Sequence, residues 1–305
     1  MTSKLVKCTL FFLSMAVATP AVAKTDIVML GTGTPIPLSA RVGSGIAVIV
    51  EGRSYLFDVG PGVWHNAVKA SELGYTSLAS QNVGTVFLTH LHSDHSLDLY
   101  SLMFSYWWRR TAPLQLIGPK GTQRMVEKLK AAIEEDYDVR MAWSPVIPDP
   151  VLFSPVVTQI HKEGCVYSDD LISVQAFKVE HAGWKHAFAY RVTTPDVSIF
   201  LSGDTKYSSS LAEKAQGVDV LFHEVFDEKW MSTTQDAVAQ AYHRAVHTQS
   251  YEVGSFANIA QPGLLVLYHV LPGTASTLSN TLAEVQSVYA GATIMGHDLD
   301  VLTYE

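Results

Sequence analysis

The stretch FLTHLHSDHSLDLY, residues 87–100, places three histidines and an aspartate within six positions, directly after an apolar run typical of a β-strand. His90, His92, Asp94 and His95 would lie on the turn beyond that strand. Imidazole and carboxylate groups suit zinc and similar divalent ions. In an irregular turn, the first two of these side chains can meet one ion while the last two reach a second. Four ligands are too few for two ions, so further histidines or aspartates are required elsewhere.

Three such residues follow other strand-like runs. His181 ends the run SVQAFKVEH, Asp204 follows SIFLSG, and His269 follows LLVLY. A single histidine after a strand is usually structural. The dense cluster together with three such strand ends instead favours metal binding, because strand ends can gather at one edge of a sheet.

Several motifs carry a resemblance to a known family. THLHSDH (89–95) resembles the HxHxDH signature of the metallo-β-lactamase superfamily. Further segments resemble its ribonuclease Z and arylsulfatase-like branch: LGTGTPIPLSARVGSG (30–45), YLFDVGPGV (55–63), IGPKG (117–121), EHAGWKHAFAYRV (180–192), LSGDT (201–205), FHEVF (222–226), HTQSYEVG (247–254), LYHVLPG (267–273) and GHDLDVLTY (296–304). The resemblance implies an α/β fold, the αββα metallo-β-lactamase sandwich, with two metal ions at one sheet edge.

The resemblance also implies a ligand set in which Asp204 bridges the two ions. The first ion would take His90, His92, His181 and Asp204, and the second Asp94, His95, Asp204 and His269. His181, nine residues before Tyr190, fits the motif better than His186, four residues before it. Whether His186 contributes to the site stays open.

A hydrolytic mechanism follows from that set. Two divalent ions, with zinc favoured, lower the pKa of a shared water toward about 7 and so supply a hydroxide nucleophile. Asp94 would orient this water as well as bind metal. The resemblance makes His247 an acid or electrostatic helper, with Glu224 holding its imidazole in place.

Two residues are candidates for substrate contact. Trp184, just after His181, could form an aromatic wall, and Arg109 could grip a sulfate or phosphate oxygen. Trp107 and Trp108 could belong to the same wall, with core packing as the alternative for these two, and a solvated helix end is the alternative for Arg109.

The N-terminus has the pattern of a secretory signal peptide over residues 1–23. Lys4 and Lys7 precede a short apolar run that ends in an Ala-Val-Ala site at residues 21–23. The run is too short for a membrane span of about 20 residues, although an uncut anchor is the alternative. We therefore expect a periplasmic or secreted protein cleaved near Ala23. Cys165 is then the one remaining cysteine, which excludes an internal disulfide.

The remaining chain of residues 24–305 is predicted to be one hydrolase domain. Strands are predicted at 26–31, 45–50, 54–60, 85–90, 171–181, 187–194, 197–204, 218–225 and 263–269. Helices are predicted at 64–74, 121–137 and 248–261, with a last helix and strand within 281–299. The Pro-rich stretch 143–158 is interpreted as an extended surface insertion.

Charge and export together favour one class of substrate. The net charge is −8, and cleavage after residue 23 removes two lysines and no acid, leaving −10. Nucleic-acid surfaces are usually basic. We therefore expect an exported arylsulfatase-like hydrolase that cleaves a small sulfate or phosphate ester, with neither a nucleic acid nor a membrane as partner and with a homodimer left open. The alternative is a ribonuclease Z-like phosphodiesterase or nuclease. A lactonase and a non-catalytic metal-binding protein rank behind both.

Overall fold

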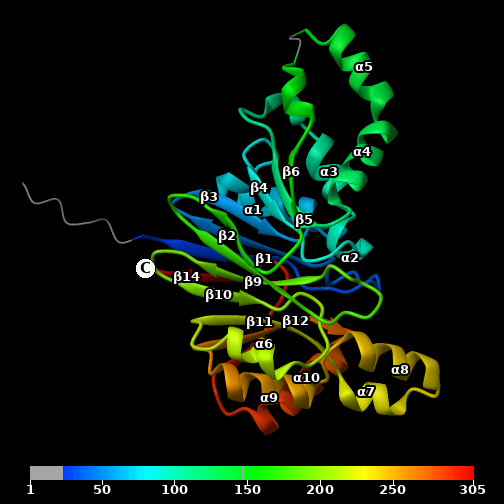
Figure 1. Cartoon of the computed structure of the whole chain (residues 1–305), viewed down its shortest axis with the longest axis vertical. Helices are drawn as coiled ribbons and strands as arrows, with labels where there is room; N and C mark the ends of the chain where they lie inside the picture. The colour runs from blue at the N-terminus through cyan, green and yellow to red at the C-terminus, as the bar shows by residue number, and fades with distance from the viewer. Residues whose placement is uncertain (1–22, 146–147) are drawn as a thin grey trace, which may run out of the picture.

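The computed structural model describes residues 23–145 and 148–305, so the predicted signal peptide lies outside the described residues except for Ala23. Two seven-stranded sheets pack face to face, and helices cover the outer face of each (Figure 1). This is the predicted αββα sandwich. Within the described residues, no helix is both long enough and apolar enough to cross a membrane.

The first sheet has the strand order β14-β1-β2-β3-β4-β5-β6. Its strands are β1 (Thr25–Gly31), β2 (Gly45–Val50), β3 (Arg53–Phe57), β4 (Thr85–Phe87), β5 (Gln115–Pro119), β6 (Val156–Ile160) and β14 (Val301–Tyr304). Strands β3 to β6 are mutually parallel, so their carboxyl ends reach the same edge. The outer face is covered by α1 (Val63–Glu72), α3 (Leu99–Phe104) and α4 (Thr122–Ala132).

The second sheet has the order β13-β12-β11-β10-β9-β8-β7. Its strands are β7 (Gly164–Ser168), β8 (Ser173–Lys178), β9 (Phe188–Thr193), β10 (Ser198–Leu201), β11 (Val220–Phe226), β12 (Leu264–Leu271) and β13 (Thr293–Met295). Its outer face is covered by α6 (Ser209–Lys214), α9 (Ser250–Ala260) and α10 (Ala275–Val288). Two short helices, α7 (Glu228–Thr233) and α8 (Ala237–Val246), connect β11 to α9.

Apolar side chains from both sheets form the central core. Val48, Phe57 and Phe87 of the first sheet share one buried cluster with Tyr190 and Phe222 of the second. The rings of Phe57 and Phe87 stack with their centres 4.7 Å apart. Because helices cover the outer faces as well, the central strands are buried on both sides, which explains their continuous apolar runs. Each such side chain contributes about 1.5–3 kcal/mol when fully buried.

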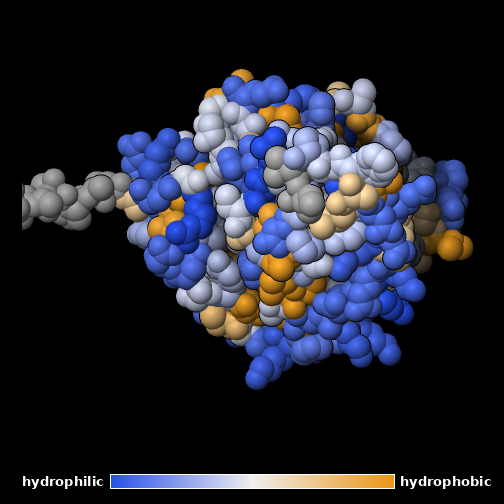
Figure 2. Space-filling view, turned by 90° about the horizontal axis from the view of Figure 1, so that it is seen from above, coloured by the Kyte–Doolittle hydropathy of each residue, from blue (hydrophilic) through white to orange (hydrophobic). Residues whose placement is uncertain are grey.

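The structure differs from the predicted elements around α4. The single helix predicted over 121–137 is two helices, α4 and α5 (Glu134–Trp143), separated by Ile133 at φ −118°. Helix α5 projects from the body (Figure 1), and its end of the molecule is largely hydrophilic around a small apolar area (Figure 2). The stretch 143–158 is only partly an insertion, because its last residues begin β6, which pairs with β5.

Candidate metal centre

Strand ends from both sheets meet at one edge and carry the candidate ligands. The loop after β4 carries His90, and the segments after β8 and β10 carry His181 and Asp204. His269 lies inside β12, where it is the extra residue of a bulge opposite Glu224 and Val225 of β11 and has φ +46°. A bulge re-aims a side chain without ending the strand, which brings this imidazole to the cluster.

Backbone contacts fix the loop of residues 88–96. The carbonyl oxygen of Asp94 accepts a hydrogen bond from the N–H of Ser44 at 2.9 Å, and that of His95 accepts one from Val59 at 2.8 Å. A Cβ on Gly60 would lie only 1.9 Å from the Asp94 carbonyl oxygen. The DVGPG segment therefore needs glycine here, because it packs directly against the metal-binding loop.

The first group of candidate ligands is His90, His92, His181 and Asp204, whose ligand atoms all lie within 4.8 Å of one another. Nδ1 of His92 is 3.0 Å from Nε2 of His90 and 3.1 Å from Nε2 of His181. A neutral imidazole carries one proton, so three converging ring nitrogens cannot all satisfy one another. A divalent cation accepts all three lone pairs.

The second group is Asp94, His95, Asp204 and His269, again within 4.8 Å. Nε2 of His269 lies 3.1 Å from Oδ2 of Asp94, and Nε2 of His95 lies 3.2 Å from Oδ1 of Asp204. Both atoms of that second pair are buried and make no hydrogen bond. Buried polar atoms are normally satisfied, so this donor set fits a metal ion. Asp204 belongs to both groups, as the ligand set predicted for a bridging aspartate requires.

Most of the cluster is in the form that binds cations, and His95 is the exception. Burial by itself lowers the pKa of His95, but Asp204, Asp58 and Asp94 raise it well above its usual value, so a metal would have to displace its proton. Burial lowers the pKa of His90 and of His181, which leaves both rings neutral. Burial alone would raise the pKa of Asp204, but His269, His95 and His90 hold it well below its usual value. Neutral imidazoles and ionised carboxylates are the forms that bind divalent metals. The residues present therefore fit two divalent ions, as is typical of this constellation.

Asp58, which the sequence analysis did not single out, positions one of the ligands. Its Oδ2 lies 2.8 Å from Nδ1 of His95 and also accepts a hydrogen bond from the Thr89 hydroxyl at 2.7 Å. Its Oδ1 accepts from the backbone N–H of Thr89 at 2.8 Å. A carboxylate on one ring nitrogen fixes the tautomer that leaves the other free for metal. The sequence signal for this role was a single aspartate at a strand end, in FDVG. An aspartate at such a position is equally typical of a turn.

His247 and Glu224 lie together beside the cluster. His247 is 6% exposed, and its Nδ1 is 3.2 Å from Oε2 of Glu224 and 3.9 Å from Oδ2 of Asp204. The other oxygen of Glu224 accepts a hydrogen bond from the backbone N–H of Thr248 at 2.9 Å. Burial by itself lowers the pKa of His247, but Glu224 and then Asp204 raise it above its usual value. A histidine that keeps its proton near neutral pH can donate it to a leaving oxygen.

Ligand atoms of Glu224, His247 and His269 also lie within 4.8 Å of one another, which is compatible with a metal group. We interpret Glu224 and His247 as an acid pair instead. Backbone N–H groups of Thr205 and Thr248 hold Oε1 of Glu224, and its Oε2, which makes no hydrogen bond, faces Nδ1 of His247 at 3.2 Å. His223 points the other way, against Phe256 with its ring centre 4.6 Å from that ring.

The other residues that the sequence suggested for the site lie at different distances from the metal-binding cluster. The indole N–H of Trp184 donates to Nε2 of His92 at 2.7 Å, so Trp184 stands beside the cluster. His186 is outside both ligand groups and lines a neighbouring pocket. Arg109 is exposed at the end of a short 3₁₀ helix whose residue Trp107 packs on Phe153, so the structure supplies no contact between Arg109 and the cluster.

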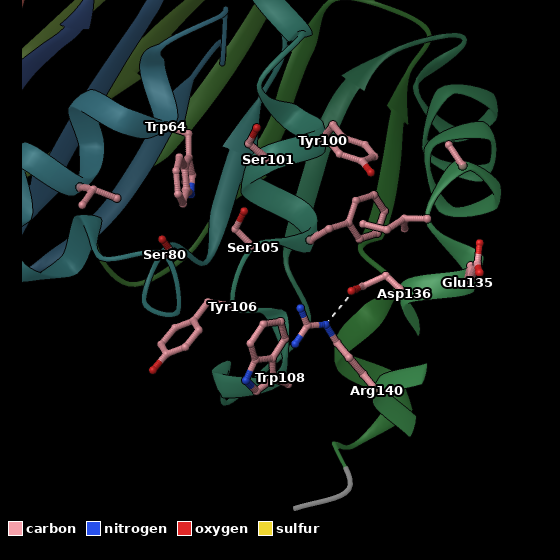
Figure 3. Close-up of a pocket in the computed structure, with 14 residues that line it drawn as sticks. Trp64, Ser80, Tyr100, Ser101, Ser105, Tyr106, Trp108, Glu135, Asp136 and Arg140 are labelled. Atoms are coloured by element: carbon pink, nitrogen blue, oxygen red, sulfur yellow. Dashed lines mark hydrogen bonds and ion pairs between the residues drawn. The ribbon is translucent and has the colours of Figure 1, made fainter. Parts of the chain in front are cut away.

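A cavity of about 910 Å³ lies elsewhere, between α3 and the start of α5 (Figure 3). Trp64, Tyr100, Tyr106 and Trp108 line it. The guanidinium of Arg140 sits 3.8 Å from the centre of the Trp108 ring and is hydrogen-bonded to Asp136 at 2.8 Å. Arg140 thus already occupies the cation position over this aromatic wall. None of the candidate metal ligands lines the cavity.

Comparisons with known proteins agree with this geometry. A family model described as a beta-lactamase superfamily domain matches residues 53–270. Ribonuclease Z of Mycobacterium sp. (strain KMS) is 32% identical over 256 residues, covering 82% of this chain and 85% of the relative. Ribonuclease Z of Mycobacterium bovis (strain BCG / Pasteur 1173P2) is 28% identical over 285 residues, covering 90% and 96%.

Two solved structures are similar in fold. The metallo-beta-lactamase fold protein YhfI from Bacillus subtilis has a TM-score of 0.69 at 19% identity, covering 92% of this chain and 99% of its own. Human tRNase Z, short form, has a TM-score of 0.66 at 20% identity, covering 91% and 98%. At these identities the structures establish the fold alone.

The comparisons correct two predictions. The arylsulfatase-like function is wrong, because relatives matching most of the chain are named Ribonuclease Z. The small-molecule ester substrate without a nucleic-acid partner is wrong for the same reason. The physical error was to use the net charge of −8, which averages over the whole surface and says nothing about charge beside the site. Cleavage near Ala23 and export stay predictions. The chain is a metal-dependent hydrolase acting on ester bonds, and it belongs to the metallo-β-lactamase superfamily, in the branch that contains ribonuclease Z.

Proposed function

We propose that this chain is a zinc-dependent phosphodiesterase of the ribonuclease Z type, which hydrolyses a phosphodiester bond in RNA. The observation that carries the proposal is the 32% identity to a ribonuclease Z across 82% of the chain. The gathered ligand groups and the adjoining pair of His247 and Glu224 support it, because hydrolysis needs both a metal site and a proton donor.

Each part of this reaction has a group on the chain. When bound, two divalent ions supply Lewis acidity and lower the pKa of a water. The residues that would hold them are His90, His92, Asp94, His95, His181, Asp204 and His269. Asp94 lies among the ligands and can also accept a proton from the attacking water. His247, held by Glu224, would give a proton to the leaving ribose oxygen, and Trp184 can stack on a base next to the cleaved bond.

Zinc is the metal that we propose. Imidazole ligands dominate the set, and imidazole suits zinc better than it suits magnesium or calcium. Elemental analysis of protein purified without added metal should find about two zinc ions per chain, the number a two-metal site holds. A preparation that binds manganese or magnesium in preference to zinc would contradict this assignment.

The proposed activity is tested by comparing three substrates side by side. Zinc-loaded protein should cleave bis-p-nitrophenyl phosphate and a transfer RNA precursor, and should leave p-nitrophenyl sulfate uncut. Asp204→Ala removes the shared ligand and should abolish phosphodiester turnover, whereas Asp138→Ala on the exposed side of α5 should not. Failure of the fully zinc-loaded protein to cut any phosphodiester would overturn the proposal.

A further inference from the structure

A second pocket, of about 650 Å³, adjoins the metal centre. We call it the basic pocket, because Lys120, Arg124, Lys185 and His186 are among its lining residues. Lys120 follows β5, Arg124 lies in the first turn of α4, and Lys185 and His186 belong to the loop after His181. Segments from both sheets thus bring cationic side chains to one hollow.

The positive charge of the basic pocket exceeds the negative charge of its lining. Lys120, Arg124 and Lys185 form no ion pair with any residue in the ranges that the structure describes. The one acidic residue of the lining, Glu127, accepts a hydrogen bond from Gln123 at 3.0 Å. Burial and then the charges of Lys120, Lys178 and nearby groups lower the pKa of His186, so Lys120 acts on this imidazole as well. The lining therefore carries three lysine or arginine side chains against one carboxylate, in a chain whose net charge is −8.

The basic pocket lies immediately beside the candidate ligands. A Cβ on Gly121 would approach Cδ1 of Leu91, which stands between His90 and His92, to 3.1 Å. On the other side, Lys185 directly follows Trp184, whose indole contacts His92 at 2.7 Å. A polymer whose phosphodiester reaches the metal centre can therefore place a neighbouring unit in this pocket.

From this placement we infer that the basic pocket is a subsite for RNA backbone phosphates next to the cleaved bond. The inference rests on the proposed function, because it assumes that the scissile group of the metal centre belongs to RNA. Lys120, Arg124 and Lys185 supply the cations that phosphate oxygens require. The start of α4 adds the positive end of an eleven-residue helix. The pocket explains how an acidic protein can hold a polyanion.

The test compares a double variant of the pocket with a charge-matched control. Lys120→Ala with Lys185→Ala removes two cations from the pocket, and Lys214→Ala with Lys229→Ala removes two exposed lysines from α6 and α7. RNA binding is measured by fluorescence anisotropy at several salt concentrations, in an Asp204→Ala background so that the RNA stays intact. Turnover of RNA and of bis-p-nitrophenyl phosphate is measured in the otherwise native holoenzyme.

The pocket variant should bind RNA about tenfold or more weakly than the control, and its plot of log affinity against log salt should be shallower by about two. Its kcat/KM should fall at least about tenfold further for RNA than for bis-p-nitrophenyl phosphate, which is too small to reach both sites. Equal RNA affinity and equal salt dependence in the two variants would overturn the inference. A native holoenzyme that cuts no phosphodiester would instead overturn the proposed function, and the anisotropy comparison separates the two failures.

Discussion

At the residue scale, the orientation of His95 depends on Asp58. Replacing Asp58 by Asn keeps the shape of the side chain, but an amide has only one accepting oxygen and cannot receive the bonds from both Thr89 groups and His95. We expect Asp58→Asn to weaken metal affinity by about 10–100-fold, as measured by chelator competition. Asp98→Asn is the control, because Asp98 accepts backbone hydrogen bonds from Gly62 and Trp64 instead. An equal loss of metal from both variants would contradict the role of Asp58.

The leaving group should reveal the role of His247. A p-nitrophenolate leaves without a proton, whereas a ribose oxygen needs one. We therefore expect His247→Ala to lower kcat on RNA by about 10²–10⁴-fold and to have a much smaller effect on bis-p-nitrophenyl phosphate. Metal content, measured in parallel, should be unchanged. Losses of similar size on both substrates would show that His247 acts on the metal centre and not on the leaving oxygen.

The sequence predicted which residues would gather but not how each is held. The spacing in HLHSDH and the three strand ends predicted the seven residues that gather. This was possible because a ligand motif and the apolar run of a strand can each be recognised within a short stretch of sequence. The bulge at His269 and the support from Asp58 depend on pairing between distant strands, so no local pattern contains them. The preference for His181 over His186 agrees with the geometry, which puts His181 alone of the two into a ligand group.

At the scale of elements, α9 and α10 pack through Gly254. A Cβ at this position would lie 2.7 Å from Cβ of Val288 and 3.0 Å from the carbonyl oxygen of Val285. Gly254→Ala should lower the free energy of unfolding by about 1–3 kcal/mol, because overpacking outweighs the gain in helix propensity of about 1 kcal/mol. Urea denaturation measures the change. Gly84→Ala is the control, since its Cβ would meet nothing within 4 Å, and a loss as large there would contradict the packing argument.

Element types were easier to predict than element ends. The buried strands β1 and β2 occupy nearly the predicted ranges, because strands covered on both faces are continuous apolar runs. Strand β6 was missed because it is a half-exposed edge strand in a Pro-rich stretch. Strands β3 and β4 end before Asp58 and His90. From these residues on, the side chains belong to the candidate metal centre and no longer to the apolar core.

At the scale of the whole molecule, Asp169 ties one sheet to the other. It follows β7 of the second sheet, and its Oδ2 accepts hydrogen bonds from the Tyr55 hydroxyl at 2.6 Å and from Arg53 at 3.2 Å, both on β3 of the first sheet. Its Oδ1 accepts from the backbone N–H groups of Leu171 and Ile172, each at 2.9 Å. Asp169→Asn should lower the free energy of unfolding by about 1–3 kcal/mol. Asp170→Asn, at an exposed residue paired with the same arginine, should change it by less than about 1 kcal/mol.

This difference should depend on pH. Burial alone would raise the pKa of Asp169, but the hydrogen bonds from Tyr55 and from the backbone lower it to about 2. A depressed carboxyl pKa stabilises the fold fully above the unfolded value of about 3.9 and loses that contribution as pH falls through the folded value. The stability gap between the native chain and Asp169→Asn should therefore narrow from about pH 4 toward about pH 2. A gap that stays constant over this range would contradict the assignment.

The candidate ligands are divided between the two halves of the sandwich. Four lie on the loop and the short helix α2 (Ser93–Ser96) that follow β4 of the first sheet, and three lie on or after strands of the second. Bound ions would therefore act as crosslinks between the halves at one end of β3, while the Asp169 contacts join them at its other end. When a chelator removes the ions, local opening of the sandwich should increase at the crosslinked end only. Deuterium uptake should then rise in residues 88–96 and 180–186 and stay constant around β7 and the start of β3. The two sheets would separate at the metal-binding end and stay joined near Asp169.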